Sequence, residues 1–369
     1  MTDPTPARAE IVVDLDAIRH NVRTLSALVA PALMMTVVKA DGYGHGLVES
    51  GRAARDGGAP WLGVATLEEA LALRKAGDTG RLLSWLTVPG EDYDPALAAD
   101  IDLTAYTVEE LDEIAAAARH AGVEARVQLK ADTGLSRGGA TMDDWGALVA
   151  HAAALEALGA LWVTGVWSHF AASDEQEHPA NDAQEAEFRR ALAIAEDAGL
   201  RPEVRHLANS AAAMLRPSSR FDLVRCGIAS YGLDPAPGRT PDLGLVPAMT
   251  AQARLALTKP IEAGAGVSYG HTWVADADTT VGLVPVGYGD GVPRHAGNRA
   301  EVWAAGHRRP VRGRICMDQF VVDLGGDLLD GGAEVVLFGP GTSGEPPGSG
   351  WPRSRRHWPC GRPGTPGGC

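Results

Sequence analysis

The chain has 369 residues, of which 45 % are hydrophobic and 22 % are charged, so it is long enough for two globular domains. Its formal net charge of −14 argues against a nucleic-acid partner, which would need a basic surface. No apolar run could span a bilayer, the N-terminus lacks a signal-peptide pattern, and the four cysteines follow no disulfide or metal-ligand spacing. We therefore expect a cytoplasmic protein with no membrane partner, no nucleic-acid partner and no metal.

Residues 1–245 alternate short apolar runs with Ala-rich segments of helical period. The first helix is predicted over Leu15–Val29. Eight apolar runs then predict strands over Leu33–Lys39, Trp61–Ala65, Leu82–Leu86, Ile101–Ala105, Ala125–Lys130, Trp162–His169, Val204–Ala208 and Leu223–Ile228. Helices are predicted between most of these strands, for example over Leu67–Ala76, Val108–Ala121 and Asp182–Ala198.

Two of these helices carry start signals. Thr66 and Thr107 stand where N-caps belong, and a glutamate follows each of them three residues later, which predicts two capping boxes. Repeated β-then-α units predict an α/β fold, with an N-terminal (β/α)₈ barrel over residues 1–245 that includes a strand and helix extension at its start. A doubly wound sheet is the competing architecture, but no GxGxxG motif follows the first strand.

The pattern changes after Leu245. Runs typical of strands are separated by Gly and Pro turns and predict a C-terminal, mainly-β domain over residues 246–339. These runs are Met249–Leu257, Thr280–Val286, Glu301–Ala305, Gln319–Leu324 and Glu334–Phe338. The tail, residues 340–369, holds eight Gly and seven Pro among its thirty residues, and we expect it to be disordered. Our hypothesis for its origin is an out-of-frame reading of GC-rich DNA.

The most informative segment is VVKADGYGHG, Val37–Gly46. It places Lys39 at the end of a predicted strand, directly before a glycine-rich turn that lets the backbone approach a ligand. A lysine amine that loses solvent also loses basicity, and it can then act as a nucleophile or as a base. The segment therefore favours Schiff-base chemistry at Lys39.

Other chemically suggestive residues also follow predicted strand ends. The carboxyl ends of the strands form the active face of such a barrel. Each residue alone has a purely structural explanation, such as a helix cap for Asn209, but their joint placement favours one site. The set is Lys39, Lys130, Arg137, His169, Asn209, Ser210, Arg225, Gly227 and Ile228.

Two subsites for anions are expected within this set. The loops after strands seven and eight often hold a phosphate in such barrels, and Ser210 offers a hydroxyl there. Gly227 and Ile228 offer backbone N–H groups, and Tyr43 would complete this phosphate site from the first loop. Arg137 is the natural partner for a substrate carboxylate, because its guanidinium can pair with two oxygens at once.

VVKADGYGHG resembles the signature of the alanine racemases, and the resemblance runs from about Ala9 to about Gly339. It implies that Lys39 carries pyridoxal 5′-phosphate (PLP) and is the base for the D enantiomer, while Tyr43 touches the phosphate of PLP. The segment VSYGH is similar to the one that holds the opposite base, which implies that Tyr269 acts on the L enantiomer. The resemblance further implies a homodimer with shared active sites, in which Tyr269 reaches the cofactor of the partner subunit.

The same resemblance implies roles for three residues of the barrel. Arg225, in LVRCGIASYG, would hydrogen-bond the pyridine nitrogen of PLP, which must then stay an unprotonated acceptor because arginine only donates. His169, in GVWSHFA, would link Arg225 to Tyr269 by hydrogen bonds. Lys130, in LKADTGLSRGG, matches a lysine that is often carbamylated in the family, and a carbamate there would hold Arg137 in place.

Three further residues follow the barrel. The backbone N–H of Met317, in ICMDQF, would meet the substrate carboxylate across the dimer. Tyr288 and Asp318 match positions that line the access channel of the family. The implied reaction is the racemisation of L-alanine to D-alanine for the supply of peptidoglycan precursors.

Three alternatives remain open at this stage. The first is a broader amino-acid racemase with a preference such as serine. The second is a PLP-dependent decarboxylase on the same barrel, which should lack the Tyr269 segment. The third is an inactive PLP-binding homologue, because the tail lacks the tyrosine that the family shows near its C-terminus.

Overall fold

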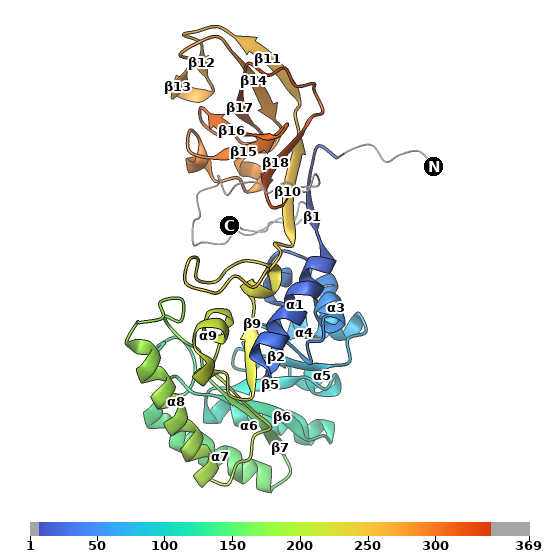
Figure 1. Cartoon of the computed structure of the whole chain (residues 1–369). Helices are drawn as coiled ribbons and strands as arrows, with labels where there is room; N and C mark the ends of the chain where they lie inside the picture. Colours follow the sequence, from blue (N-terminus) through green and yellow to red (C-terminus); the bar gives the residue numbers. More distant parts are fainter. Residues whose placement is uncertain (1–6, 341–369) are drawn as a thin grey trace. The chain divides into compact units, whose positions relative to one another are not determined.

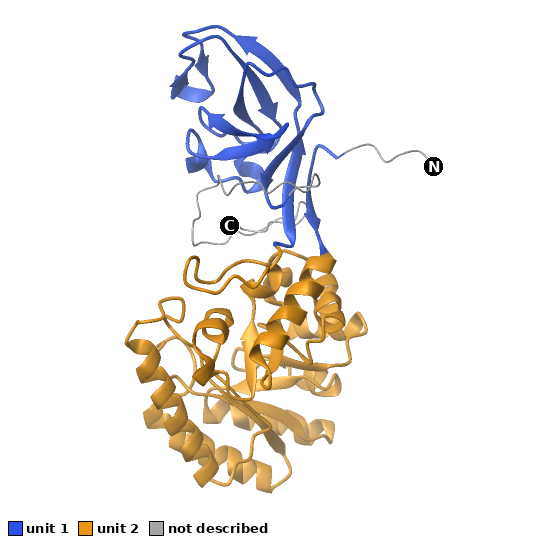
Figure 2. Ribbon diagram, in the orientation of Figure 1, with its two compact units in different colours: residues 1–14, 247–369 blue, residues 15–246 orange. Residues whose placement is uncertain are grey.

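The computed structural model describes residues 7–340, which fall into two compact units. One unit comprises residues 15–246, and the other combines residues 1–14 with residues 247–369 (Figure 2). Within the described residues, no helix is long and apolar enough to cross a membrane. The predicted disordered tail lies almost entirely outside the described residues.

The first unit is built on an eight-stranded parallel sheet in the order β8-β7-β6-β5-β4-β3-β2-β9 (Figure 1). β2 pairs with both β3 and β9, and a bridge between Asn209 and Arg225 joins the segments of β8 and β9, so the sheet closes into a barrel. The strands are β2 (Leu33–Val37), β3 (Trp61–Val64), β4 (Arg81–Ser84), β5 (Asp102–Ala105), β6 (Ala125–Lys130), β7 (Leu161–Trp167), β8 (Val204–His206) and β9 (Leu223–Cys226). The predicted (β/α)₈ barrel is confirmed, with each of the eight strands near its expected place.

Helices follow the strands on the outside of this barrel. They are α1 (Leu15–Val29), α2 (Lys39–Tyr43), α3 (Leu47–Asp56), α4 (Leu67–Lys75), α5 (Asp94–Ala98), α6 (Val108–Ala121), α7 (Met142–Ala157), α8 (Ala180–Asp197) and α9 (Ser210–Leu215). α1 shows why these segments are helical, because its apolar residues Ile18, Val22 and Leu25 recur at helical spacing and are all fully buried.

The predicted capping box of α4 is present. The Thr66 hydroxyl accepts a hydrogen bond from the Glu69 N–H, and the Glu69 carboxylate accepts one from the Thr66 N–H. The other oxygen of Glu69 accepts from the N–H of Ala40 at 2.7 Å, directly after Lys39. The start of α4 therefore also supports the turn that follows β2. At α6 the second predicted capping box forms only in part: the Thr107 hydroxyl accepts from the N–H of Glu110, while the Glu110 carboxylate accepts from the N–H of Tyr106 at 2.6 Å.

The second unit is a mainly antiparallel sheet of eight strands in the order β1-β10-β18-β15-β16-β17-β14-β11, with a separate two-stranded ribbon of β12 and β13. Its core includes Val284, Phe320 and Val322, which are at most 1 % exposed. The strands are β1 (Ala9–Val13), β10 (Met249–Arg254), β11 (Leu257–Ile261), β12 (Gly266–Val267), β13 (Trp273–Val274), β14 (Thr279–Val284), β15 (Glu301–Ala304), β16 (His307–Arg312), β17 (Phe320–Gly325) and β18 (Glu334–Phe338). The predicted mainly-β fold of the C-terminal part of the chain is confirmed.

The N-terminal strand does not belong to the barrel unit. β1 pairs antiparallel with β10, from Ala9 opposite Ala253 to Val13 opposite Met249. The predicted first domain, residues 1–245, therefore differs from the observed division at its N-terminal end. The physical reason is that the backbone groups of β1 find their partners in a strand that comes 240 residues later, which no local pattern reveals.

We expect Thr66→Ala to lower the free energy of unfolding by about 1 kcal/mol, because the N–H of Glu69 loses its side-chain acceptor. Thr66→Ser keeps a hydroxyl at the N-cap and should unfold close to the wild type. Urea unfolding followed by circular dichroism measures both variants. Equal midpoints for the alanine and serine variants would show that the capping box contributes no stability.

Candidate active site

Lys39 begins a turn of left-handed backbone at the carboxyl end of β2. Residues 40–44 all have positive φ, from 53° at Ala40 to 82° at Gly44. For residues other than glycine this conformation costs roughly 1–2 kcal/mol each. The sequence limits the cost by placing glycine at three of the seven positions from Ala40 to Gly46. An added Cβ at Gly42 would come within 2.7 Å of Ser50 Oγ, so the turn also needs glycine for space.

Two carboxylates stabilise this strained turn, one from Asp41 within it and one from Glu69 in α4. Asp41 Oδ1 accepts from the N–H of Leu47 at 2.9 Å, and Glu69 accepts from that of Ala40. Burial and the positive charge of Arg137 lower the pKa of Lys39, while the carboxylate of Glu69 acts in the opposite direction. The backbone that follows Lys39 is therefore held in place. The amine of Lys39 is more readily neutral than that of an exposed lysine.

Arg225 lies at the centre of the site and is 4 % exposed. Its Nη1 donates to the carbonyl of His206 at 3.1 Å, and its Nη2 donates to the carbonyl of Ser168 at 2.7 Å. Burial lowers the pKa of Arg225 to about 9. Among the hydrogen bonds of residues 7–340, none uses the Nε–H of Arg225, so one donor of the guanidinium stays available to a ligand.

Two histidines accept from the same guanidinium. Arg225 Nη1 lies 3.0 Å from Nδ1 of His206, and Nη2 lies 3.0 Å from Nδ1 of His169. Because a guanidinium only donates, Nδ1 of each histidine must be unprotonated. Burial, and then the charge of Arg225, lower the pKa of both histidines well below the usual value. Both rings are therefore neutral, with their proton on Nε2.

A buried chain of polar groups sets the same orientation from the opposite end. His206 Nε2 lies 2.7 Å from Gln128 Oε1, and Gln128 Nε2 donates to Asp102 Oδ2 at 3.2 Å. Asp102 is fully buried and forms ion pairs with Arg81 and Arg126. Since the carboxylate accepts only, the amide of Gln128 must turn its oxygen to His206, which makes Nε2 of His206 the donor.

Lys130 closes β6 among other cations. Its Nζ lies 4.4 Å from the ring centre of Trp167, and Arg225 stands 4.8 Å from the same ring. Burial and the charges of Arg225 and Arg137 lower the pKa of Lys130 to about 8. No hydrogen bond or ion pair joins its amine to another of the described residues. Arg137 itself is exposed in the loop after β6.

Most of the residues predicted to hold a phosphate lie together in the loops that follow β8 and β9. Asn209 caps α9 by accepting from the N–H of Ala212, and Ser210 Oγ accepts from the N–H of Gly227 at 3.0 Å. An added Cβ at Gly227 would overlap the hydroxyl of Tyr43, so only glycine leaves room there. Ile228 begins the short 3₁₀ helix that follows. Burial raises the pKa of Tyr43 to about 12, so its phenol keeps its proton.

The four predicted residues of the second unit also form one group. The N–H of Tyr288 donates to the carbonyl of Cys316 at 3.0 Å, and that of Gly289 donates to the carbonyl of Met317 at 2.7 Å. Ser268, next to Tyr269, donates through Oγ to the carbonyl of Arg314 at 2.6 Å. The loops that hold Tyr269, Tyr288, Met317 and Asp318 are therefore bonded together. The side chains of Tyr269 and Met317 are 68 % and 54 % exposed, which leaves them accessible.

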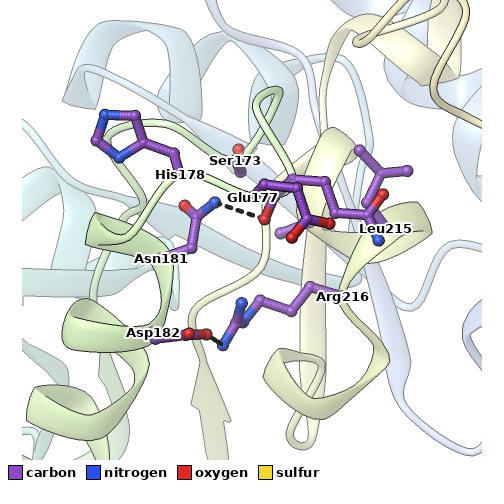
Figure 3. A pocket seen from close by; sticks show the side chains of 9 residues that line it. Ser173, Glu177, His178, Asn181, Asp182, Leu215 and Arg216 are labelled. Carbon is purple, nitrogen blue, oxygen red and sulfur yellow. Dashed lines mark hydrogen bonds and ion pairs between the residues drawn. The ribbon is translucent and has the colours of Figure 1, made fainter.

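One well-formed pocket lies away from these residues. Figure 3 shows it between the start of α8 and the end of α9, with Asp182 bonded to Arg216 at its floor. None of the predicted site residues lines it. Two of its lining residues contact Asn209: the Ser173 hydroxyl donates to Asn209 Oδ1 at 2.8 Å, and the N–H of Ala212 donates to the same oxygen at 3.1 Å. Shape alone would therefore have pointed to a different part of the barrel.

Sequence reasoning missed the residues that orient Arg225. His206 stands three residues before Asn209 at the end of β8, so the rule that selected the other strand ends could have found it. Gln128 and Asp102 lie inside the barrel on strands that read as ordinary, and their role depends on contacts across the sheet. The contact of Trp167 with Lys130 and Arg225 could not be predicted, because Trp167 lies in an apolar run, where a tryptophan is usually part of the core.

Two family models match the chain. Residues 13–235 match the family described as alanine racemase, N-terminal domain, and residues 248–353 match alanine racemase, C-terminal domain. The second match continues past Gly339, where we expected the resemblance to end.

Individual relatives are similar over nearly their whole length. The alanine racemase of Frankia casuarinae is 55 % identical over 346 residues, which are 93 % of this chain and 90 % of the relative. The crystal structure of alanine racemase from D-cycloserine-producing Streptomyces lavendulae superposes with a TM-score of 0.90 at 53 % identity and covers 93 % of this chain and 90 % of its own. That of Bacillus anthracis with bound L-Ala-P gives 0.80 at 32 % identity and covers 91 % and 87 %.

The fold and the similarity to these relatives place the chain among the isomerases that act on amino acids. The chain belongs to the alanine racemase family.

The lowered pKa of Lys130 makes a prediction about stability in the absence of ligands and carbon dioxide. Between about pH 8 and 10.5 the unfolded chain binds more protons at this site, so the free energy of unfolding rises with pH over that window. Lys130→Met removes the effect. It should be more stable than the wild type below pH 8, by on the order of 3 kcal/mol, and this gain should vanish as pH approaches 10.5.

Urea unfolding at a series of pH values measures this difference. Lys75→Met is the matched control, because Lys75 is an exposed lysine at the end of α4. A constant difference between wild type and Lys130→Met across the window would contradict the lowered pKa.

Proposed function

We propose that this chain racemises alanine with PLP bound through Lys39, by a two-base mechanism. The observation that carries the proposal is the joint presence, at one end of the barrel, of a lysine of lowered pKa and a buried arginine with one donor left over. The relatives at 53–55 % identity carry the name alanine racemase. The substrate assignment rests on those relatives, and the residue roles rest on the geometry.

The residues present fit PLP at both ends of that molecule. The unused Nε–H of Arg225 suits the pyridine nitrogen, which has only a lone pair to offer. At the other end, the hydroxyls of Ser210 and Tyr43 and the backbone N–H of Ile228 suit a phosphate, and Gly227 adds no Cβ there. The N–H of Gly227, which donates to Ser210 Oγ in this structure, would turn to the phosphate. When bound, PLP supplies the electron withdrawal that makes the α-proton of the amino acid removable.

The proton transfers would be made by Lys39 and Tyr269. Lys39, as a neutral amine, would face one side of the substrate and act there as the base for the D enantiomer. Tyr269 of a second copy would hold the opposite face and act on the L enantiomer. His169 keeps its proton on Nε2, so it can donate to the oxygen of that tyrosine while Arg225 occupies its Nδ1.

Binding of the substrate carboxylate falls to Arg137 and to the N–H of Met317, while Tyr288 and Asp318 would line the access channel. Lys130 beside Arg137 would repel it as an ammonium group. A pKa of about 8 leaves part of the amine neutral at physiological pH, which is the form that adds carbon dioxide. The carbamate would be an anion and would attract Arg137.

This assignment places the protein in the cytoplasm as a homodimer that supplies D-alanine for peptidoglycan. In such a homodimer, Tyr269 and Met317, which are exposed on the second unit, would reach the site of the partner subunit. A broader, serine-type racemase and an inactive PLP-binding homologue remain the competing functions. Incubation with PLP and L-alanine in D₂O distinguishes a racemase from the inactive homologue, because only racemisation yields D-alanine carrying α-deuterium.

Lys39→Ala should lose the visible absorbance of the lysine-bound cofactor and at least about 10²–10⁴-fold in racemisation rate, since it removes both the attachment point and a base. Borohydride reduction followed by peptide mapping should label Lys39 alone among the four lysines of the chain. Lys75→Ala is the matched control and should keep both properties. A label on another lysine, or a persistent visible band in Lys39→Ala, would refute the assignment.

Carbamylation of Lys130 should be visible directly. Holoenzyme equilibrated with ¹³CO₂ is expected to show a carbamate ¹³C resonance that is absent from Lys130→Ala, and the signal should grow with pH as the amine loses its proton near pH 8. Lys130→Ala should also raise KM for alanine more than it lowers kcat, because Arg137 loses its anionic neighbour. A wild-type spectrum without the resonance would contradict the carbamate.

A further inference from the structure

Ser268, directly before Tyr269, has a backbone conformation that residues other than glycine rarely adopt. Its φ is 60° and its ψ is −173°, which is a region of the Ramachandran map essentially restricted to glycine. The next residues continue the irregular turn, with φ of 72° at Gly270 and 42° at His271. Such a conformation costs free energy and persists only where the surroundings enforce it.

The enforcing contact at Ser268 is its own hydroxyl. Oγ donates to the carbonyl of Arg314 at 2.6 Å and lies 3.4 Å from Sγ of Cys316. The neighbouring segment comes close because Gly313 has φ of 76°, where an added Cβ would lie 2.8 Å from Cβ of Ser268. The strained backbone of Ser268 is therefore bonded to the loop that leads to Met317.

The far end of the turn is tied to the same segment. Asn298 donates through Nδ2 to the carbonyl of Thr272 at 3.2 Å, and its Oδ1 accepts from the N–H of Gly313 at 2.6 Å. Tyr269 lies between these two anchors with 68 % of its surface exposed. Since so little of the second unit packs against its side chain, the backbone, which sets the direction of the Cα–Cβ bond, is the main constraint on where that side chain can reach.

We propose that Ser268 is a positioning residue for Tyr269, whose hydroxyl holds the backbone in the conformation that aims the phenol. The inference rests on the proposed role of Tyr269 as a base. It explains why a serine occupies a position where glycine would be free of strain. Glycine would permit the conformation, whereas serine both resists it and fixes it through Oγ.

Two substitutions separate the hydroxyl from the strain. Ser268→Ala keeps the strain and loses the anchor, so the turn should relax and misplace Tyr269, and kcat should fall by about 10²-fold. Ser268→Gly also loses the anchor but can adopt the conformation without strain, so it should be at least about tenfold faster than Ser268→Ala. This order, with the smaller residue more active, is not expected from loss of a side-chain contact alone.

Further measurements on the holoenzyme distinguish positioning from general damage. Cofactor absorbance should be unchanged in both variants, because PLP binds to the other unit. The substrate deuterium isotope effect on kcat/KM should rise for L-alanine and not for D-alanine in Ser268→Ala, because only the step at Tyr269 is slowed. Ala305→Gly is the control, since Ala305 also has positive φ, 50°, but lies in the β15–β16 turn.

The outcomes test the role of Ser268 and the role of Tyr269 separately. Wild-type kinetics in Ser268→Ala, or equal losses in Ser268→Ala and Ser268→Gly, would overturn the positioning role while leaving the proposed function intact. Tyr269→Phe, measured alongside, should slow racemisation strongly with PLP still bound. If it keeps the wild-type rate, the role of Tyr269 in the proposed function fails, and the role of Ser268 fails with it.

Discussion

A buried guanidinium that can only donate fixes which atoms donate and which accept in the hydrogen-bond chain inside the barrel. Arg225 points four of its N–H groups at carbonyls and at the Nδ1 atoms of two histidines, and each acceptor must be oriented to suit. Asp102, which can only accept, imposes the complementary orientation through Gln128. The two ends agree at His206, where both demand a neutral ring with its proton on Nε2. A single arrangement of protons therefore satisfies the chain from Asp102 to Arg225.

The same region concentrates positive charge. Burial lowers the pKa of Lys39 and Lys130, and neighbouring positive charges, Arg137 for Lys39 and Arg225 with Arg137 for Lys130, lower it further. A site with this excess is costly for the protein alone and becomes favourable when anions enter it. A phosphate, a substrate carboxylate and a carbamate on Lys130 would supply such charges. The site is therefore incomplete electrostatically until its ligands are bound.

Much of the barrel could be predicted from the sequence because its strands are continuous apolar runs and its helices carry local start signals, as at Thr66. The second unit was harder. The predicted strand Met249–Leu257 proved to be two strands, since the chain turns after Arg254, and β16 was missed because its charged residues obscure the alternation. The strand ends gave the predicted site residues. Contacts across the barrel, such as that of Gln128 with His206, left no trace in the local pattern.

The pairing of β1 with β10 has a consequence for how the chain reaches this structure. Ribosomal synthesis releases β1 first, yet the strand that completes it follows only after the entire barrel has been made. During that interval an extended, half-apolar segment has unsatisfied backbone groups, and such segments can pair with the wrong chain. Long sequence separation also slows the closing of a contact. The second sheet should therefore be the last part to mature, and its nascent edge the point at which newly made chains associate prematurely.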